Sequence, residues 1–179
     1  ENRFKPGICN RLDRGTSGLM AVAKHAHAHE RLQAQQMEGT LHRTYLAVCE
    51  GIPTPPEGTI DAPIGRVPGS VLAREVRPDG AAARTRYTVL RTGRGRSLVR
   101  AEPETGRTHQ IRVHLAHLGC PLAGDFLYGT ELAALPDRFA LHSAALVLRH
   151  PVTDAPMTFM DPLPAELARL LEDDVEKDS

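Results

Sequence analysis

The chain has 179 residues, 41% of them hydrophobic and 25% charged, and its 22 basic side chains balance its 22 acidic ones. That length and composition suit one globular domain with a single core and exclude two full domains. No run of about 18 apolar residues occurs, and residues 1–6 are unlike a secretion signal, so the sequence predicts a soluble, cytoplasmic protein and argues against a membrane protein.

The first part of the chain alternates short strands with one helix. Leu19–Ala23 is a strand candidate, and Ala26–Met37 is expected to form a helix that ends at Gly39. Arg43–Glu50 is the next expected strand. Its apolar side chains alternate onto both faces, which is typical of a strand that is covered on both sides.

The rest of the chain is expected to form an antiparallel meander, a helix and closing elements. Thr108 is the expected N-cap of the helix, whose apolar residues recur at helical spacing until Gly119 ends it. The other expected strands and the closing helix are 71–76, 84–91, 97–101, 139–148, 157–160 and 164–171. The predicted fold class is α+β, with a mostly antiparallel mixed sheet flanked by helices and loops.

The cysteines form no recognisable framework. Cys9, Cys49 and Cys120 are odd in number, lie far apart and include no CxxC pair. Neither a set of disulfides nor a zinc site is therefore indicated. We expect reduced thiols, which agree with a cytoplasmic location.

Charge is distributed unevenly along the chain. Ten arginines and four acidic residues lie between Arg74 and Arg112, a local charge of +6, whereas seven acids and two bases lie between Asp161 and Ser179, a local charge of −5. The basic segment is a candidate phosphate-binding surface, because contacts with phosphates supply much of the affinity of proteins for nucleic acids. The alternative is a set of solvated strands that happen to be rich in arginine.

The first stretch with chemical content is Asn10–Gly18, NRLDRGTSG, in which Asp13 lies between Arg11 and Arg14. Neighbouring cations keep a carboxylate ionised and available as a nucleophile or a base. Taken alone, the same residues also suit a surface loop whose aspartate forms an ordinary ion pair or caps a turn.

Two further stretches combine polar side chains with regular structure. Tyr45 lies in the strand segment RTYLAVCEG, where a tyrosine is ordinarily a core or interface residue. The segment TGRTHQIRVH, residues 105–114, leads into the expected helix, whose free N-terminal N–H groups favour an anionic neighbour such as a phosphate or Asp13. Arg112 lies one turn into that helix, and a guanidinium can hold a carboxylate bidentately. A basic amphipathic helix at the surface would explain the apolar spacing equally well.

Together these stretches closely resemble the motifs of the RluA-type RNA pseudouridine synthase family. NRLDRGTSG, followed by LMAVAK, is similar to the family signature HRLDxxTSG, and RTYLAVCEG is similar to the family's tyrosine-containing strand. TGRTHQIRVH matches a third motif, and LHSAAL, with His150-Pro151 after it, resembles the family's closing strands. The resemblance runs from about Pro6 to Pro164 and implies the pseudouridine synthase fold.

The resemblance implies roles for individual residues. Asp13 matches the family's catalytic aspartate, Arg112 the arginine that pairs with it, and Tyr45 the ring that stacks on the flipped uracil and whose hydroxyl is a candidate to remove the C5 proton. Arg11 matches the arginine associated with displacing the target base. Asn10 replaces the usual histidine, which excludes proton transfer there and leaves a structural role. The other expected RNA- or substrate-binding residues are Arg14, Thr16, Arg107, His109 and Gln110.

The reaction implied by the resemblance is the isomerisation of specific uridines in RNA to pseudouridine, without a cofactor. The base must first leave its stack, at a cost of a few kcal/mol. Asp13 then attacks C1′ of the ribose or C6 of the uracil, or acts as a base to give a glycal, and the sequence leaves these routes open. Large-subunit ribosomal RNA is the first expected partner and transfer RNA the second, with the protein monomeric.

We expect residues 1–179 to form a single catalytic domain. In the family the aspartate signature lies well inside the catalytic domain, whereas here it begins at residue 10. The chain is therefore expected to lack N-terminal strands of the domain and any S4-type RNA-binding domain.

Two other functions agree with parts of the sequence. A catalytically inactive RNA-binding relative would keep the arginines, but all three expected catalytic side chains are present. A metal-dependent nuclease or phosphoesterase could use Asp13, Asp125 and the histidines, of which His25 and His29 share a helix face. Because no HExxH motif and no obvious carboxylate ligand accompany these histidines, we expect no metal site.

Overall fold

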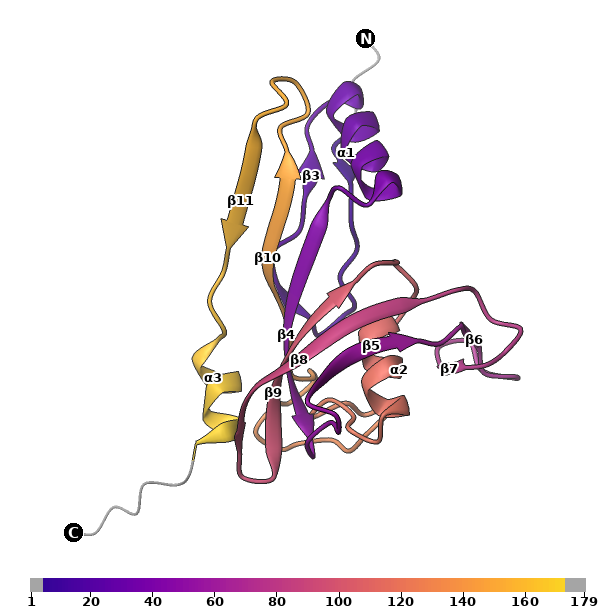
Figure 1. The fold of residues 1–179 in the computed structure, drawn as a ribbon, viewed down its shortest axis with the longest axis vertical. Coiled ribbons are helices and arrows are strands. Elements are labelled where there is room, and N and C mark those ends of the chain that lie inside the picture. Colours follow the sequence, from indigo (N-terminus) through magenta and orange to yellow (C-terminus); the bar gives the residue numbers. More distant parts are fainter. Residues whose placement is uncertain (1–4, 173–179) are drawn as a thin grey trace, which may run out of the picture.

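The computed structural model describes residues 5–172, which form one large sheet, two small sheets and three α-helices (Figure 1). The strands of the large sheet are β2 (Ser17–Gly18), β4 (His42–Glu50), β5 (Glu57–Asp61), β8 (Arg84–Gly93), β9 (Arg96–Pro103), β10 (Leu141–Arg149) and β11 (Pro156–Met160). The small sheets are β1 (Gly7–Ile8) with β3 (Val22–Ala23), and β6 (Ile64–Arg66) with β7 (Arg74–Val76). The helices are α1 (Ala26–Glu38), α2 (Gln110–His117) and α3 (Ala165–Ala168), with a 3₁₀ turn at Arg169–Leu171.

The large sheet is mixed but mostly antiparallel. Along its main path the strand order is β11–β10–β4–β9–β8–β5, and all the neighbours on that path are antiparallel. The short β2 joins β10 in parallel. The expected α+β architecture is confirmed. None of the helices within residues 5–172 is both long and apolar enough to cross a membrane.

Helices and loops cover both faces of the sheet. On one face, Tyr45 and Ala47 of β4 share a buried cluster with Leu115 of α2. On the other face, Val48 of β4 packs with Leu167 and the 3₁₀ turn that follows α3. The expectation that this strand is covered on both sides is therefore confirmed, since its neighbouring side chains enter two different cores.

Helix α1 lies where the sequence places it and is capped at both ends. His25 is the N-cap, and its Nδ1 accepts a hydrogen bond from the backbone N–H of Ala28 at 3.2 Å. Gly39 ends the helix in the left-handed conformation, with φ of 72°. Leu32 packs α1 against β3 and Leu148 of β10 (Figure 1).

Two strand predictions are wrong in extent. Of the expected strand Leu19–Ala23, only the end forms a strand, β3. The expected strand 71–76 shortens to β7, which pairs with β6 in a hairpin outside the meander. The shortening follows from a local turn, because the backbone N–H of Ala73 donates to Ser70 Oγ at 2.9 Å and closes the chain on itself.

Gly18 of β2 lies in close contact with the backbone of β10, just after the Asp13 loop. Its φ is +102°, and a Cβ atom there would lie 2.2 Å from the backbone oxygen of Ser143. The next residue, Leu19, donates its N–H to that same oxygen at 2.9 Å. Only glycine permits this close approach, which fixes the chain that leaves the Asp13 loop.

We expect Gly18→Ala to destabilise the protein more than Gly69→Ala does. Gly69 also has a positive φ, but nothing lies within 4 Å of the position its Cβ would take. Gly69→Ala should therefore lose only the roughly 1–2 kcal/mol of a left-handed non-glycine residue. Gly18→Ala should lose clearly more free energy of unfolding in urea titrations. Equal losses would show that the approach to Ser143 is not a constraint.

Candidate active site

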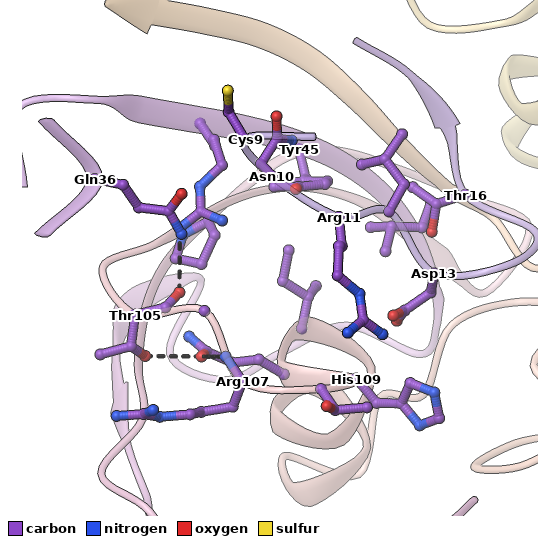
Figure 2. A pocket seen from close by; sticks show the side chains of 18 of the residues that line it. Cys9, Asn10, Arg11, Asp13, Thr16, Gln36, Tyr45, Thr105, Arg107 and His109 are labelled. Carbon is purple, nitrogen blue, oxygen red and sulfur yellow. Dashed lines mark hydrogen bonds between the residues drawn. The ribbon is translucent and has the colours of Figure 1, made fainter. Parts of the chain in front are cut away.

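A pocket of about 270 Å³ opens where three segments meet: residues 8–16, β4 and the loop 103–111 that leads into α2 (Figure 2). This volume is near the lower end of small-molecule sites, roughly 300–1,000 Å³. Seven of the nine expected site residues line it: Arg11, Asp13, Thr16, Tyr45, Arg107, His109 and Gln110. Arg14 is exposed outside this lining, and Arg112 is buried behind it.

Asp13 presents a partly exposed carboxylate, with 29% of its side chain accessible. Its backbone oxygen accepts a hydrogen bond from the N–H of Thr16 at 2.9 Å, which closes the loop. Among residues 5–172, the cation paired with its carboxylate is Arg112, whose Nη1 lies 3.9 Å from Oδ2. The pairing cation is thus the arginine that the resemblance implies and not a flanking one, although Arg11 extends into the pocket beside Asp13 (Figure 2).

Arg112 is held chiefly by Asp125. Its Nε and Nη2 donate to the two carboxylate oxygens of Asp125, both at 2.8 Å, and the two side chains are only 3% and 0% exposed. The backbone N–H of Leu127 also donates to Asp125, at 3.0 Å. Arg112 therefore lies beside Asp13, as the resemblance implies, but the contact between them is not bidentate. Asp125 takes the two-pronged contact and leaves Nη1 for Asp13.

Aromatic rings complete the setting of Arg112. The guanidinium carbon lies 4.2 Å from the ring centroid of Phe139, 4.9 Å from that of Tyr128 and 5.9 Å from that of Phe126. Ring faces attract cations at such distances. Arg112 is thus fixed by hydrogen bonds in its plane and by rings around it, so its position relative to Asp13 is set before any ligand binds.

Tyr45 places its ring in the pocket wall from β4. The residue is 6% exposed, and burial raises the pKa of its phenol above the usual value, with the nearby Asp13 charge acting in the same direction and Arg43 opposing it. The phenol is therefore neutral at physiological pH. A base in the pocket would meet a ring with its hydroxyl still protonated.

The loop before α2 is organised by Gln110. Its Oε1 accepts from Thr105 Oγ1 at 2.7 Å and from the backbone N–H of Arg107 at 2.9 Å, and its Nε2 donates to the backbone oxygen of Arg84 at 2.9 Å and to Thr85 Oγ1 at 3.0 Å. All of the amide's main hydrogen-bonding directions are therefore used inside the protein. Gln110 therefore shapes the pocket wall, and its expected contact with RNA stays a prediction.

These bonds also explain why the predicted N-cap is wrong. Helix α2 begins at Gln110, not directly after Thr108, and the residue between them, His109, has φ of 58° in the left-handed region. His109 makes no side-chain capping hydrogen bond, and the Gln110 amide instead accepts the N–H of Arg107 and holds the loop just before the helix. The helix end still faces the pocket, since Gln110 and Ile111 both line it.

His109 is joined to the hydroxyl of Tyr128, which lies 2.7 Å from its Nδ1. That hydroxyl accepts the backbone N–H of Arg74 at 2.9 Å, so its own hydrogen is free to point to the imidazole. Burial lowers the pKa of His109, and the charge of Arg112 lowers it further. If the hydroxyl donates to Nδ1, the neutral ring carries its proton on Nε2.

Asn10 and Thr16 lie on the segment that carries Asp13. Asn10 is buried, and its Oδ1 accepts the backbone N–H of Ala21 at 2.8 Å, which agrees with the structural role left open by the loss of the usual histidine. Thr16 Oγ1 is buried at the pocket without a hydrogen-bond partner among the described residues. Thr16 therefore offers a hydroxyl that a bound ligand could use.

The histidines of α1 take local partners. His25 caps the helix, and His29 Nε2 lies 3.3 Å from Gln33 Nε2. Asp125 faces Arg112. Within the described part of the chain, no three His, Cys, Asp or Glu side chains converge as metal ligands.

The basic segment is partly neutralised within the protein. Arg84 and Arg86 lie 3.5 and 3.3 Å from Glu104, and Arg96 lies 2.9 Å from Glu50. Exposed ion pairs of this kind contribute about 0–1 kcal/mol, so they can exchange for phosphate at little cost. Within residues 5–172, several arginines of this basic segment are therefore already paired with acids of the chain.

A family model described as RNA pseudouridylate synthase matches residues 1–117. The chain belongs to this family. An uncharacterised RNA pseudouridine synthase of Bacillus subtilis, YjbO, is 47% identical over 165 residues, which cover 92% of this chain and 58% of that protein. Ribosomal large subunit pseudouridine synthase D of Pseudomonas aeruginosa is 41% identical over 180 residues, covering 93% and 56%. The chain spans somewhat more than half the length of these curated relatives.

The fold of this RNA pseudouridylate synthase family member is similar to solved structures. Human RNA pseudouridylate synthase domain containing 1 superposes with a TM-score of 0.74 at 29% identity, covering 88% of this chain and 69% of that one. The motif resemblance in the sequence and the similarity of the fold thus lead to the same family.

Sequence reasoning missed the residues that hold the arginine of this pseudouridylate synthase domain. Asp125 entered only as a possible metal ligand, and Phe139 only as the start of a strand. The available signal was chemical: Arg112 lies between Ile111 and Val113 near the start of the expected helix, and a buried cation requires an anionic partner. That partner lies in a loop outside the helix, and spacing along the sequence does not identify it.

Proposed function

We propose that this chain isomerises uridine in RNA to pseudouridine, with Asp13 as the catalytic carboxylate. The observation that supports the proposal most directly is the pairing of a partly exposed Asp13 with a buried, immobilised Arg112 at the wall of a small pocket. A fixed cation can hold the carboxylate in one orientation, which a nucleophile or base requires. Membership of the RNA pseudouridylate synthase family supports the same reaction.

The isomerisation is balanced without any external reactant. The N1–C1′ glycosidic bond breaks, the uracil turns and a C5–C1′ bond forms, while C5 loses a proton and N1 gains one. Asp13 would start the sequence at C1′, at C6 or as a base. Tyr45 would stack on the base and take part in the transfer of the C5 proton, and Arg11 would occupy the space that the flipped base leaves.

The proposed partner is RNA, with large-subunit ribosomal RNA as the first candidate and transfer RNA as the second. The name of the Pseudomonas aeruginosa relative assigns that protein to the ribosomal large subunit. We propose that the chain acts as a monomer in the cytoplasm. In addition to Arg11, the proposed RNA contacts are Arg14, Thr16, Arg107 and His109.

The reaction can be tested with large-subunit ribosomal RNA and transfer RNA transcripts labelled with tritium at uridine C5. Incubation with the purified chain should release tritium to water, because formation of the C5–C1′ bond expels the C5 proton. Binding of either RNA without tritium release would favour the inactive RNA-binding relative. Tritium release that a chelator abolishes would favour a metal-dependent reaction.

Tyr45 variants separate stacking from proton transfer. Stacking of a base on an aromatic ring is worth about 1–3 kcal/mol, so Tyr45→Ala should weaken both RNA capture and turnover. Tyr45→Phe keeps the ring and should bind RNA as the unmodified protein does, yet fail to release tritium. Full tritium release by Tyr45→Phe would remove the hydroxyl from the mechanism. Normal binding and turnover by Tyr45→Ala would leave Tyr45 as a packing residue of the core.

A further inference from the structure

A second hollow, of about 490 Å³, adjoins the pocket on the side away from Asp13. It runs between the last turns of α1 and the loop 104–107, and its lining residues are Cys9, Gln33, Gln36, Met37, Arg43, Glu104, Thr105, Gly106 and Arg107. Six of these residues also line the pocket, so the two spaces are continuous. In Figure 2, Gln36, Thr105 and Arg107 lie on the side of the pocket opposite Asp13. We call this hollow the α1 groove.

The cations of the α1 groove retain bonding capacity. Arg43 makes one long hydrogen bond, from Nη2 to the backbone oxygen of Thr105 at 3.4 Å, and its Nε is buried without a partner in the described part of the chain. Arg107 donates its Nε to the backbone oxygen of Ala82 at 2.8 Å, and residues 5–172 offer its guanidinium no ion pair. Guanidinium groups in this state suit phosphate oxygens, which can accept two parallel hydrogen bonds.

The acid in the groove does not oppose an anionic ligand. Glu104 lies 3.5 Å from Arg84 and 3.3 Å from Arg86, which neutralise its charge from the side of β8. The net character of the groove is therefore positive, and it is set by Arg43 and Arg107.

The α1 side of the groove offers a different surface. Gln33 and Gln36 lie one turn apart on the helix and present amide groups that both donate and accept hydrogen bonds. The next residue, Met37, is 88% exposed and does not belong to a hydrophobic core. An amide beside an exposed thioether can bond to the edge of a nucleobase and cover its face.

We propose that the α1 groove binds the nucleotide next to the target uridine. Arg43 and Arg107 would hold its phosphate, and Gln36 with Met37 would contact its base and so set a preference for the neighbouring sequence. A base that enters the pocket stays joined to its strand, and the strand must leave by an opening. The groove is an opening that is continuous with the pocket and lined by cations. The inference rests on the proposed function and adds a residue-level basis for substrate choice.

Sequence preference tests the contacts to the base. The probe is a pool of RNA hairpins with one loop uridine and randomised neighbours, in which pseudouridine is mapped by sequencing after reaction. For the unmodified chain we expect a preference of roughly fivefold or more at one neighbouring position. Gln36→Ala and Met37→Ala should reduce that preference to less than twofold, whereas His27→Ala, an exposed residue of α1 that lines neither the pocket nor the groove, should leave it intact. An unchanged preference in both groove variants would overturn the proposal.

Salt dependence tests the contact to the phosphate and needs no turnover. Binding of single-stranded oligouridine is measured over a range of salt concentrations, where each phosphate contact contributes a slope of about 0.7 in log K against log salt. Arg43→Gln should lower the slope by about 0.7, and Arg43→Lys should keep it. Arg149→Gln is the matched control for net charge, since Arg149 lies at the end of β10 and pairs with Asp154 at 2.8 Å.

The results of these two experiments distinguish a failure of the groove proposal from a failure of the proposed function. If the unmodified chain forms no pseudouridine in any hairpin but Arg43→Gln lowers the salt slope and Arg149→Gln does not, the groove proposal stands as RNA binding while the catalytic assignment fails. If pseudouridine forms and the slope of Arg43→Gln equals that of the unmodified chain, the groove proposal fails and the catalytic assignment stands.

Discussion

Replacing Asp13 with asparagine is expected to abolish pseudouridine formation and to leave RNA affinity within several-fold of the unmodified protein. The amide keeps the shape of the side chain but can act neither as a nucleophile nor as a base, whichever of the three routes the reaction takes. The substitution should also leave stability nearly unchanged. Asp13 is partly exposed, and its ion pair with Arg112 spans 3.9 Å, which makes a small contribution to folding.

The measurement for Asp13→Asn is tritium release over many hours at saturating RNA, accompanied by urea unfolding and filter binding. Asp79→Asn is the control, because Asp79 is an exposed acid that pairs with Arg77 in the turn after β7. It should turn over like the unmodified protein. Turnover by purified Asp13→Asn above that of a mock preparation would remove Asp13 from the catalytic role.

Arg112→Lys is expected to lower turnover by roughly 100-fold or more, because a displacement of about 1 Å at a catalytic group can cost that much. Lysine keeps the charge but has one nitrogen where arginine presents a fork. It cannot make both 2.8 Å bonds to Asp125 and still place a third donor toward Asp13. It also loses the flat face that lies over Phe139. Asp13 would then still have a positive charge nearby, but that charge would no longer be held in a fixed position.

The same substitution should reduce stability, so the two effects must be separated. Asp125 is fully buried, and loss of one of its hydrogen bonds should cost about 1–3 kcal/mol. Turnover is therefore measured where urea titration shows Arg112→Lys to be folded. Arg96→Lys is the matched control, since Arg96 also donates Nε to a carboxylate at 2.9 Å but faces Glu50 at the far end of β9. Equal turnover of Arg112→Lys and the unmodified protein would show that Arg112 acts only as a distant charge.

The local sequence determined the features that depend on neighbours in the chain. Helix α1 has its expected place because His25 and Gly39 act within one turn of its ends. The two covered faces of β4 follow from its alternating apolar residues, and the α+β class follows from the order of such elements.

Only the tertiary structure decided the contacts that join distant segments. Asp125 takes the bidentate pair expected for Asp13, because the loop after α2 brings its carboxylate to 2.8 Å from Arg112 in a place that water does not reach. Helix α2 begins at Gln110, because the Gln110 side chain bonds to β8 and to the preceding loop at once. Local sequence propensities predict neither interaction, because each one joins segments whose separation is set by the folded sheet.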